Sequence, residues 1–118
     1  MYTRVLVVDD DPEMRRLIQS ILQVLNLGTK DASNSEEAEK IFKQYNPDVL
    51  ITDYNMPGKN GRELAQVLRA QKPALKVLIV SGESPELLDG LRNQGYSTLE
   101  KPFGISDIKQ KLSNLSLL

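Results

Sequence analysis

The feature that most limits the fold is a regular alternation of short apolar runs with segments of helical periodicity. The strongest strand candidates are residues 4–8, 49–52 and 76–80. These runs are apolar on successive residues, as expected of strands buried on both faces. Weaker candidates at residues 29–32 and 98–100 stand where the alternation requires them. No linker or repeat interrupts this order, so we expect one domain over residues 1–118.

The intervening segments repeat apolar residues at the spacing of amphipathic helices. The first helix is predicted to begin after Asp11, a good N-cap residue, with Pro12 at its first position. A second helix follows Asn34 or Ser35 and ends before Pro47, because proline cannot continue a helix.

A third helix opens at Asn60, where Glu63 completes the spacing of a capping box, and two more helices follow it. The predicted inner faces are Met14, Leu17, Ile18, Ile21, Leu22 and Leu25, then Ala38, Ile41, Phe42 and Tyr45, then Leu64, Val67 and Leu68, then Leu87, Leu88 and Leu91, and finally Ile105, Ile108, Leu112 and Leu115. Strands joined by crossover helices are parallel and right-handed. The pattern therefore predicts an α/β fold with a doubly wound, five-stranded parallel sheet and five helices.

The composition excludes several kinds of site. The chain has no cysteine and no histidine, so it cannot form disulfides, zinc sites built on those ligands or histidine-based triads. A formal net charge of −1 with interspersed signs argues against nucleic-acid binding by this domain. Its apolar runs are too short to span a bilayer, and we expect a cytoplasmic protein without a membrane segment.

Polar side chains collect at the ends of the predicted strands. Asp9 and Asp10 follow the first strand, Asp53 the third, Ser81 the fourth and Lys101 the fifth. Each residue alone has a structural explanation as a cap, a turn residue or a solvated charge. Together they place several carboxylates and one ammonium at one edge of the sheet, where ligands of such folds bind. Their mutual repulsion calls for a hard divalent cation, and oxygen ligands shared with phosphate suit Mg²⁺.

In these positions the chain resembles the receiver domains of two-component response regulators. The matching motifs are VVDDD at 7–11, ITDYNMPG at 51–58 with Gly61, IVSG at 79–82 and KPF at 101–103. The resemblance covers essentially the whole chain and implies the flavodoxin-like strand order 2-1-3-4-5. We interpret the proline and glycines around Gly58 and Gly61 as shaping the site, the glycines by permitting positive φ.

The resemblance implies a role for each polar residue. Asp53 would be the phosphoacceptor, with Ser81 as the switch hydroxyl and Lys101 as the contact to the phosphoryl group. Magnesium would be held by Asp53, directly by Asp10, by Asp9 through a water and by the backbone carbonyl of Asn55. An aspartyl phosphate is the expected product, consistent with a carboxylate nucleophile among cationic groups.

Partners also follow from the resemblance. The phosphoryl donor would be a phosphohistidine on a sensor histidine kinase or a histidine phosphotransfer protein, which would dock on the first helix at exposed residues of the segment 12–25. An unknown downstream protein would read the surface formed by the fourth helix, the fifth strand and the fifth helix.

The chain departs from the family pattern in two places. The family often carries an aromatic residue three positions before the lysine, where Thr98 stands here. We interpret the nearby Tyr96 as a surface aromatic. The segments 28–32 and 95–101 are shorter than usual, so we expect a reduced second strand.

Three alternatives compete with this interpretation. A receiver-like interaction module that is never phosphorylated would usually lose part of the acidic pocket. Asp9 and Asp11 also form the Asp-x-Asp motif of aspartate-based phosphatases. That family carries threonine or valine near position 13, where Glu13 stands here, and it also requires a cap domain. A flavin binder on the same fold would require a Ser/Thr/Gly-rich loop after the first strand, where this chain has aspartates.

Overall fold

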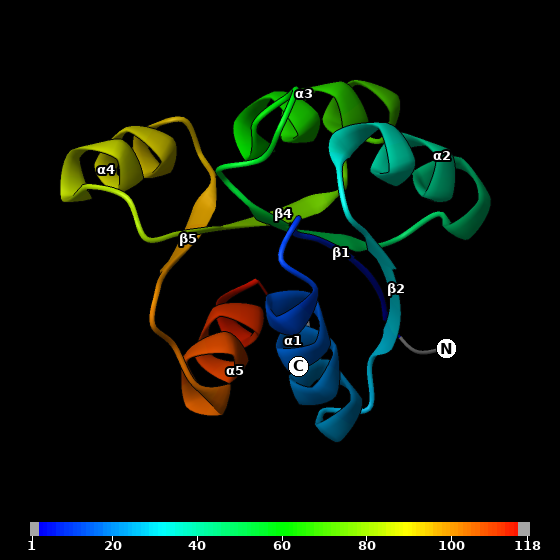
Figure 1. Ribbon diagram of the computed structural model, residues 1–118, viewed down its shortest axis with the longest axis horizontal. Coiled ribbons are helices and arrows are strands. Elements are labelled where there is room, and N and C mark those ends of the chain that lie inside the picture. The colour runs from blue at the N-terminus through cyan, green and yellow to red at the C-terminus, as the bar shows by residue number, and fades with distance from the viewer. Residues whose placement is uncertain (1–2, 116–118) are drawn as a thin grey trace.

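A single parallel sheet lies between two layers of helices (Figure 1). The structure is a computed structural model that describes residues 3–115. The strands are β1 (Arg4–Val8), β2 (Gly28–Ala32), β3 (Val49–Asp53), β4 (Lys76–Ser81) and β5 (Ser97–Glu100). The helices are α1 (Pro12–Val24), α2 (Ser35–Tyr45), α3 (Gly61–Gln71), α4 (Pro85–Asn93) and α5 (Ile105–Asn114). The strand order β2-β1-β3-β4-β5 confirms the predicted doubly wound fold.

Alternate side chains of each central strand face opposite layers, which gives the molecule two cores. On β1, Leu6 and Val8 belong to the core beneath α2, α3 and α4. Val5 and Val7 belong to the core beneath α1 and α5. Because these strands are buried on both faces, their sequences show successive apolar residues without polar alternation.

Side chains cap the helices where the sequence predicted it. Asp11 accepts a hydrogen bond from the backbone of Glu13, and Pro12 is the first residue of α1. Asn34, one of the two predicted starting residues, caps α2. Asn60 and Glu63 form the predicted capping box at α3. None of the helices within residues 3–115 has the length and apolar character needed to cross a membrane.

Two residues assigned to inner helix faces are exposed. Leu17 on α1 is 45% exposed and Ile105 on α5 is 50% exposed. With about 100° of rotation per residue, Leu17 and Ile105 each lie at the margin of their apolar stripe, beyond the arc that the sheet covers. The centre of each stripe is buried, as at Ile18 and Ile108.

Two further expectations were wrong. Tyr96 is not a surface aromatic: it is only 8% exposed and lies in the core beneath α2, α3 and α4, with the Arg69 guanidinium 5.1 Å from its ring centroid. Gly95, at φ +91°, ends the turn after α4 and returns the chain to this core. The second strand is not reduced, because all five residues of β2 pair with β1.

Candidate functional site

The predicted site residues lie at the carboxyl ends of four neighbouring strands. Asp9 and Asp10 directly follow β1, while Asp53 and Ser81 are the last residues of β3 and β4. Lys101 directly follows β5. Since β1, β3, β4 and β5 are adjacent and parallel, their carboxyl ends meet at one edge of the sheet. Main-chain bonds extend this registry past the strands, for example from the Lys101 amide to the Ser81 carbonyl at 3.0 Å.

Three carboxylates and one ammonium converge at this edge. Asp9, Asp10 and Asp53 each offer an oxygen within 4.8 Å of the others. Lys101 Nζ lies 3.3 Å from Asp53 Oδ1 and 3.9 Å from Asp9 Oδ2. Asp9 and Asp53 are buried, whereas Asp10 is exposed. One ammonium faces three carboxylates, so the pocket carries an excess of negative charge.

The pKa of each buried carboxyl reflects this crowding. Burial is the largest cause that raises the pKa of Asp9 from an ordinary 3.8 to about 6; Asp53 and Asp10 add to it, and the Asp11 amide and Lys101 oppose it. Burial likewise raises the pKa of Asp53, against the attraction of Lys101. Any further positive charge in the pocket would therefore stabilise the ionised form of both carboxyls.

The residues present fit a magnesium ion. Asp9 Oδ2 is buried and has no hydrogen-bond partner, so a polar atom in the pocket is left for another ligand. Mg²⁺ binds oxygens at about 2.1 Å, so two oxygens on one ion lie about 3.0 to 4.2 Å apart. Oxygens of the three carboxylates lie within 4.8 Å of one another, so a small closure would let them share one ion. Carboxylate oxygens are also the donors that this ion prefers.

Ser81 and Asn55 lie at the same edge and share a partner. Ser81 is buried, and its hydroxyl oxygen accepts a hydrogen bond of 2.9 Å from the Glu83 amide. The Asn55 side chain donates to the carboxylate of Glu83. Glu83 thus joins the loops after β3 and β4 and was not singled out by the sequence. The assignment of the Asn55 carbonyl as a metal ligand stays a prediction.

The two glycines near Asp53 shape the site for different reasons. Gly58 has φ +77°, as the sequence suggested. Gly61 does not have a positive φ; instead, a Cβ atom there would lie 2.4 Å from the backbone oxygen of Asp53. The start of α3 therefore approaches the end of β3 too closely for a side chain.

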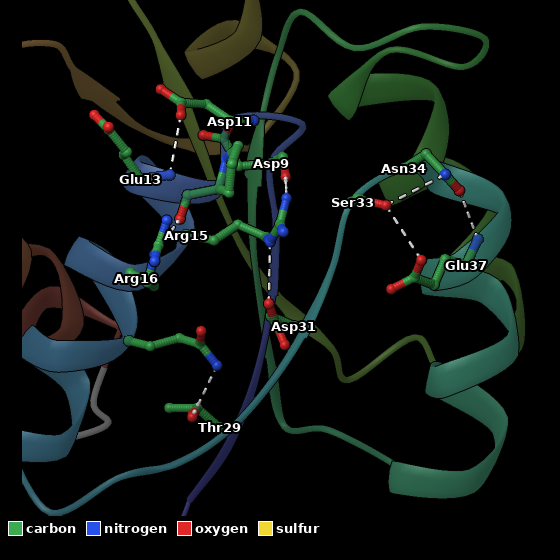
Figure 2. A network of polar contacts seen from close by, with 12 residues as sticks. Asp9, Asp11, Glu13, Arg15, Arg16, Thr29, Asp31, Ser33, Asn34 and Glu37 are labelled. Carbon is green, nitrogen blue, oxygen red and sulfur yellow. Dashed lines mark hydrogen bonds and ion pairs between the residues drawn. The ribbon is translucent and has the colours of Figure 1, made fainter.

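A guanidinium supports the site from the side of α1 and β2. Arg15 Nη1 donates to the backbone carbonyl of Asp9 at 2.7 Å, and its Nε donates to Asp31 Oδ2 at 3.0 Å. Figure 2 shows Arg15 between these two partners. Sequence reasoning missed this pair, because nothing in the spacing of Arg15 and Asp31 indicates that they meet.

Comparisons with known proteins agree with the geometry. A family model for the response regulator receiver domain matches residues 5–113. The chain is 34% identical over 121 residues to a chemotaxis protein CheY homolog of Campylobacter jejuni, covering 95% of this chain and 91% of that protein. It is 33% identical over 111 residues to the autoinducer 1 sensor kinase/phosphatase LuxN of Vibrio campbellii, covering 93% of this chain but only 13% of LuxN.

Solved structures show the same fold. The response regulator TrrA of Thermotoga maritima, in complex with Mg²⁺ and BeF, matches with a TM-score of 0.85 and 33% identity, over 96% of this chain and 98% of that one. The chemotaxis response regulator CheY4 of Vibrio cholerae matches with a TM-score of 0.87 and 28% identity, over 98% and 99% of the two chains.

Proposed function

Since the chain belongs to the response regulator receiver domains, a family of phosphoacceptor signalling domains and not of classical enzymes, we propose that Asp53 accepts the phosphoryl group in this protein. The observation that supports this choice is the position of its carboxylate, 3.3 Å from the Lys101 ammonium and beside Asp9 and Asp10. An anionic nucleophile and an anionic donor repel each other, and the Lys101 ammonium together with a cation bound by the carboxylates would offset that repulsion. The residues 1–118 then form one receiver domain.

Magnesium binding belongs to the same proposal. Asp10, Asp53 and the Asn55 carbonyl would hold the ion, with Asp9 contributing through a water. Bound there, the ion would supply positive charge that neutralises the phosphoryl oxygens. The orphaned Asp9 Oδ2 and the TrrA complex with Mg²⁺ and BeF support this assignment.

The chain's own residues account for the chemistry of transfer. A carboxylate oxygen of Asp53 attacks phosphorus, a new O–P bond forms, and the bond to the donor breaks with its electron pair leaving on the donor. Lys101 lies where it can contact a phosphoryl oxygen on Asp53. The Ser81 hydroxyl accepts from Glu83, so its own hydrogen stays free to donate to another phosphoryl oxygen. These same groups would assist the later hydrolysis of the aspartyl phosphate.

The partners are proposed at the level of class. The donor is a phosphohistidine on a sensor histidine kinase or a histidine phosphotransfer protein, docked on α1, where Leu17 and Val24 are exposed apolar residues. A downstream protein target binds the surface formed by α4, β5 and α5. With these partners the protein would act in the cytoplasm, and we expect this domain to bind neither nucleic acid nor a membrane.

Mass spectrometry after incubation with acetyl phosphate and Mg²⁺ tests the acceptor. We expect one added phosphoryl group on the wild type and none on Asp53→Asn. Asp48→Asn is a matched control, because Asp48 directly precedes β3 while Asp53 ends it. Equal labelling of wild type and Asp53→Asn would refute the assignment.

The same experiment separates the alternatives. An interaction module that is never phosphorylated would give no labelled wild type at any Mg²⁺ concentration. A phosphatase that uses the Asp9 and Asp11 motif would keep releasing phosphate from the donor in the Asp53→Asn variant, whereas a receiver that works through Asp53 would not. The intact carboxylate cluster argues against the first of these outcomes.

A further inference from the structure

We infer that Arg15, anchored by Asp31, is a positioning residue for the magnesium site and acts through Asp9. This inference rests on the proposed function and adds to it a residue outside the acidic pocket. Arg15 lies in the first turns of α1, and Asp31 lies on β2, the strand farthest from Lys101 and β5 in the sheet order. The pair therefore connects the pocket to a part of the fold that contributes no ligand.

Asp9 is held at three of its four polar groups. Its amide donates to the Ala32 carbonyl at 3.2 Å, and its carbonyl accepts from Arg15 at 2.7 Å. Its Oδ1 accepts from the Asp11 amide at 2.9 Å. The remaining oxygen, Oδ2, is buried without a hydrogen bond. These bonds fix the carboxylate so that its free oxygen faces the pocket, and the Arg15 bond is the one made by a replaceable side chain.

The geometry of Arg15 requires a guanidinium. One nitrogen binds the Asp9 carbonyl while a second binds Asp31, so the rigid fork spans a backbone group and a carboxylate at once. The Arg15 side chain is only 18% exposed, which limits its exchange with water. A lysine ammonium on a flexible stem would reach either partner but would not hold both in one plane.

The neighbouring Arg16 gives a matched control on the same helix. Its side chain is exposed, and its Nε donates to the Pro12 carbonyl at 3.3 Å, within α1 itself. Figure 2 shows Arg16 pointing away from the Asp31 side of the network. Arg15 and Arg16 therefore share residue type, charge and helix but differ in contact with Asp9.

Calorimetric titration of the unphosphorylated protein with Mg²⁺ tests the inference without any phosphoryl donor. Groups that orient a metal ligand typically change metal affinity 10-fold or more when removed, so we expect Arg15→Ala to raise the Kd for Mg²⁺ about 10-fold. Asp31→Asn, which keeps the Arg15 bond to Asp9 but weakens its anchor, should raise the Kd less. Arg15→Lys should fall between Arg15→Ala and wild type, and Arg16→Ala should match wild type.

Labelling by acetyl phosphate provides a second measurement that a general loss of structure would not reproduce. At limiting Mg²⁺ the Arg15→Ala protein should label more slowly than wild type, and at saturating Mg²⁺ its rate should recover. If Arg15→Ala fails to label at every Mg²⁺ concentration, the inference is overturned while the proposed function stays intact. The same holds if Arg15→Ala and Asp31→Asn both bind Mg²⁺ with the wild-type Kd. Absence of Mg²⁺ binding by the wild type would instead contradict the proposed function. If Arg15→Ala does not fold, Asp31→Asn and Arg15→Lys carry the test.

Discussion

At the scale of single residues, Gly61 stands where the protein has no room for a side chain. A Cβ atom at this position would lie 2.4 Å from the Asp53 backbone oxygen, and both groups belong to main chain that cannot move independently. We expect Gly61→Ala to lower the free energy of unfolding by about 1–3 kcal/mol, the usual cost of overpacking. At Gly82 the nearest atom to an added Cβ is 3.8 Å away, so Gly82→Ala should cost little. Equal denaturant midpoints for the two variants would contradict this account.

The raised pKa of Asp9 gives a pH dependence whose sign is opposite to that of an ordinary ion-paired carboxylate. The folded pKa is about 6 and the ordinary value is 3.8, so the native state binds the proton more tightly than the unfolded chain. The contribution of Asp9 to stability is therefore greatest at low pH and falls as pH rises through this interval. Without metal, we expect wild type to lose on the order of 2–3 kcal/mol relative to Asp9→Asn between about pH 4 and pH 7. Parallel stability curves for the two proteins in EDTA would show that Asp9 does not titrate in this way.

At the scale of single elements, α4 is the least favoured helix by sequence. Gly90 lies in its interior and has no φ requirement, and an added Cβ would meet nothing within 4 Å. Glycine costs a helix interior about 1 kcal/mol relative to alanine. Gly90→Ala should therefore stabilise the protein by about that amount and slow hydrogen exchange in α4. Unchanged exchange in residues 85–93 would contradict the expectation.

Gly95, in the turn that follows the same helix, provides the contrast to Gly90. It also has open space around it, but its φ of +91° strains any residue with a Cβ atom. Gly95→Ala should therefore destabilise the protein even though no atom is crowded. The opposite signs of the two substitutions would separate backbone conformation from packing as the cause.

The elements and their order follow from the sequence because the signals that define them are local. Apolar runs of strand length, cap residues such as Asn60 and the polar residues at strand ends are all read within a few positions of one another. Parallel strands then bring the ends together without any knowledge of side-chain contacts. For this reason the cluster of Asp9, Asp10, Asp53 and Lys101 could be expected before the structure was known.

The features that sequence did not predict depend on long-range placement. The burial of Tyr96 depends on the turn at Gly95 and on Arg69 of α3 lying over its ring. The contact between Arg15 and Asp31 depends on how α1 lies beside β2, which periodicity does not specify. Thr98 is similar: it is buried, and Arg92 of α4 donates to its hydroxyl at 2.9 Å, an interaction with no counterpart in the local pattern.

At the scale of the whole molecule, the proposed metal site joins parts of the chain that are distant in sequence. Its carboxylates follow β1 and end β3, two adjacent central strands that are buried on both faces. The complete set of ligands therefore exists only in the folded state, and magnesium should stabilise the whole fold and not one loop. Binding of this kind adds about 1 kcal/mol when free Mg²⁺ is roughly five times its Kd.

Asp10→Asn separates this metal effect from the intrinsic stability of the pocket. The variant should lose most of the stabilisation by Mg²⁺, because it removes a carboxylate from the cluster of three. In EDTA, however, it should be as stable as wild type or more so, since removing one negative charge relieves the repulsion on Asp9 and Asp53. Thermal unfolding of both proteins with and without Mg²⁺ gives the four values needed. A clear destabilisation of Asp10→Asn in EDTA would mean that Asp10 supports the fold through other contacts, and that like-charge repulsion does not dominate the empty pocket.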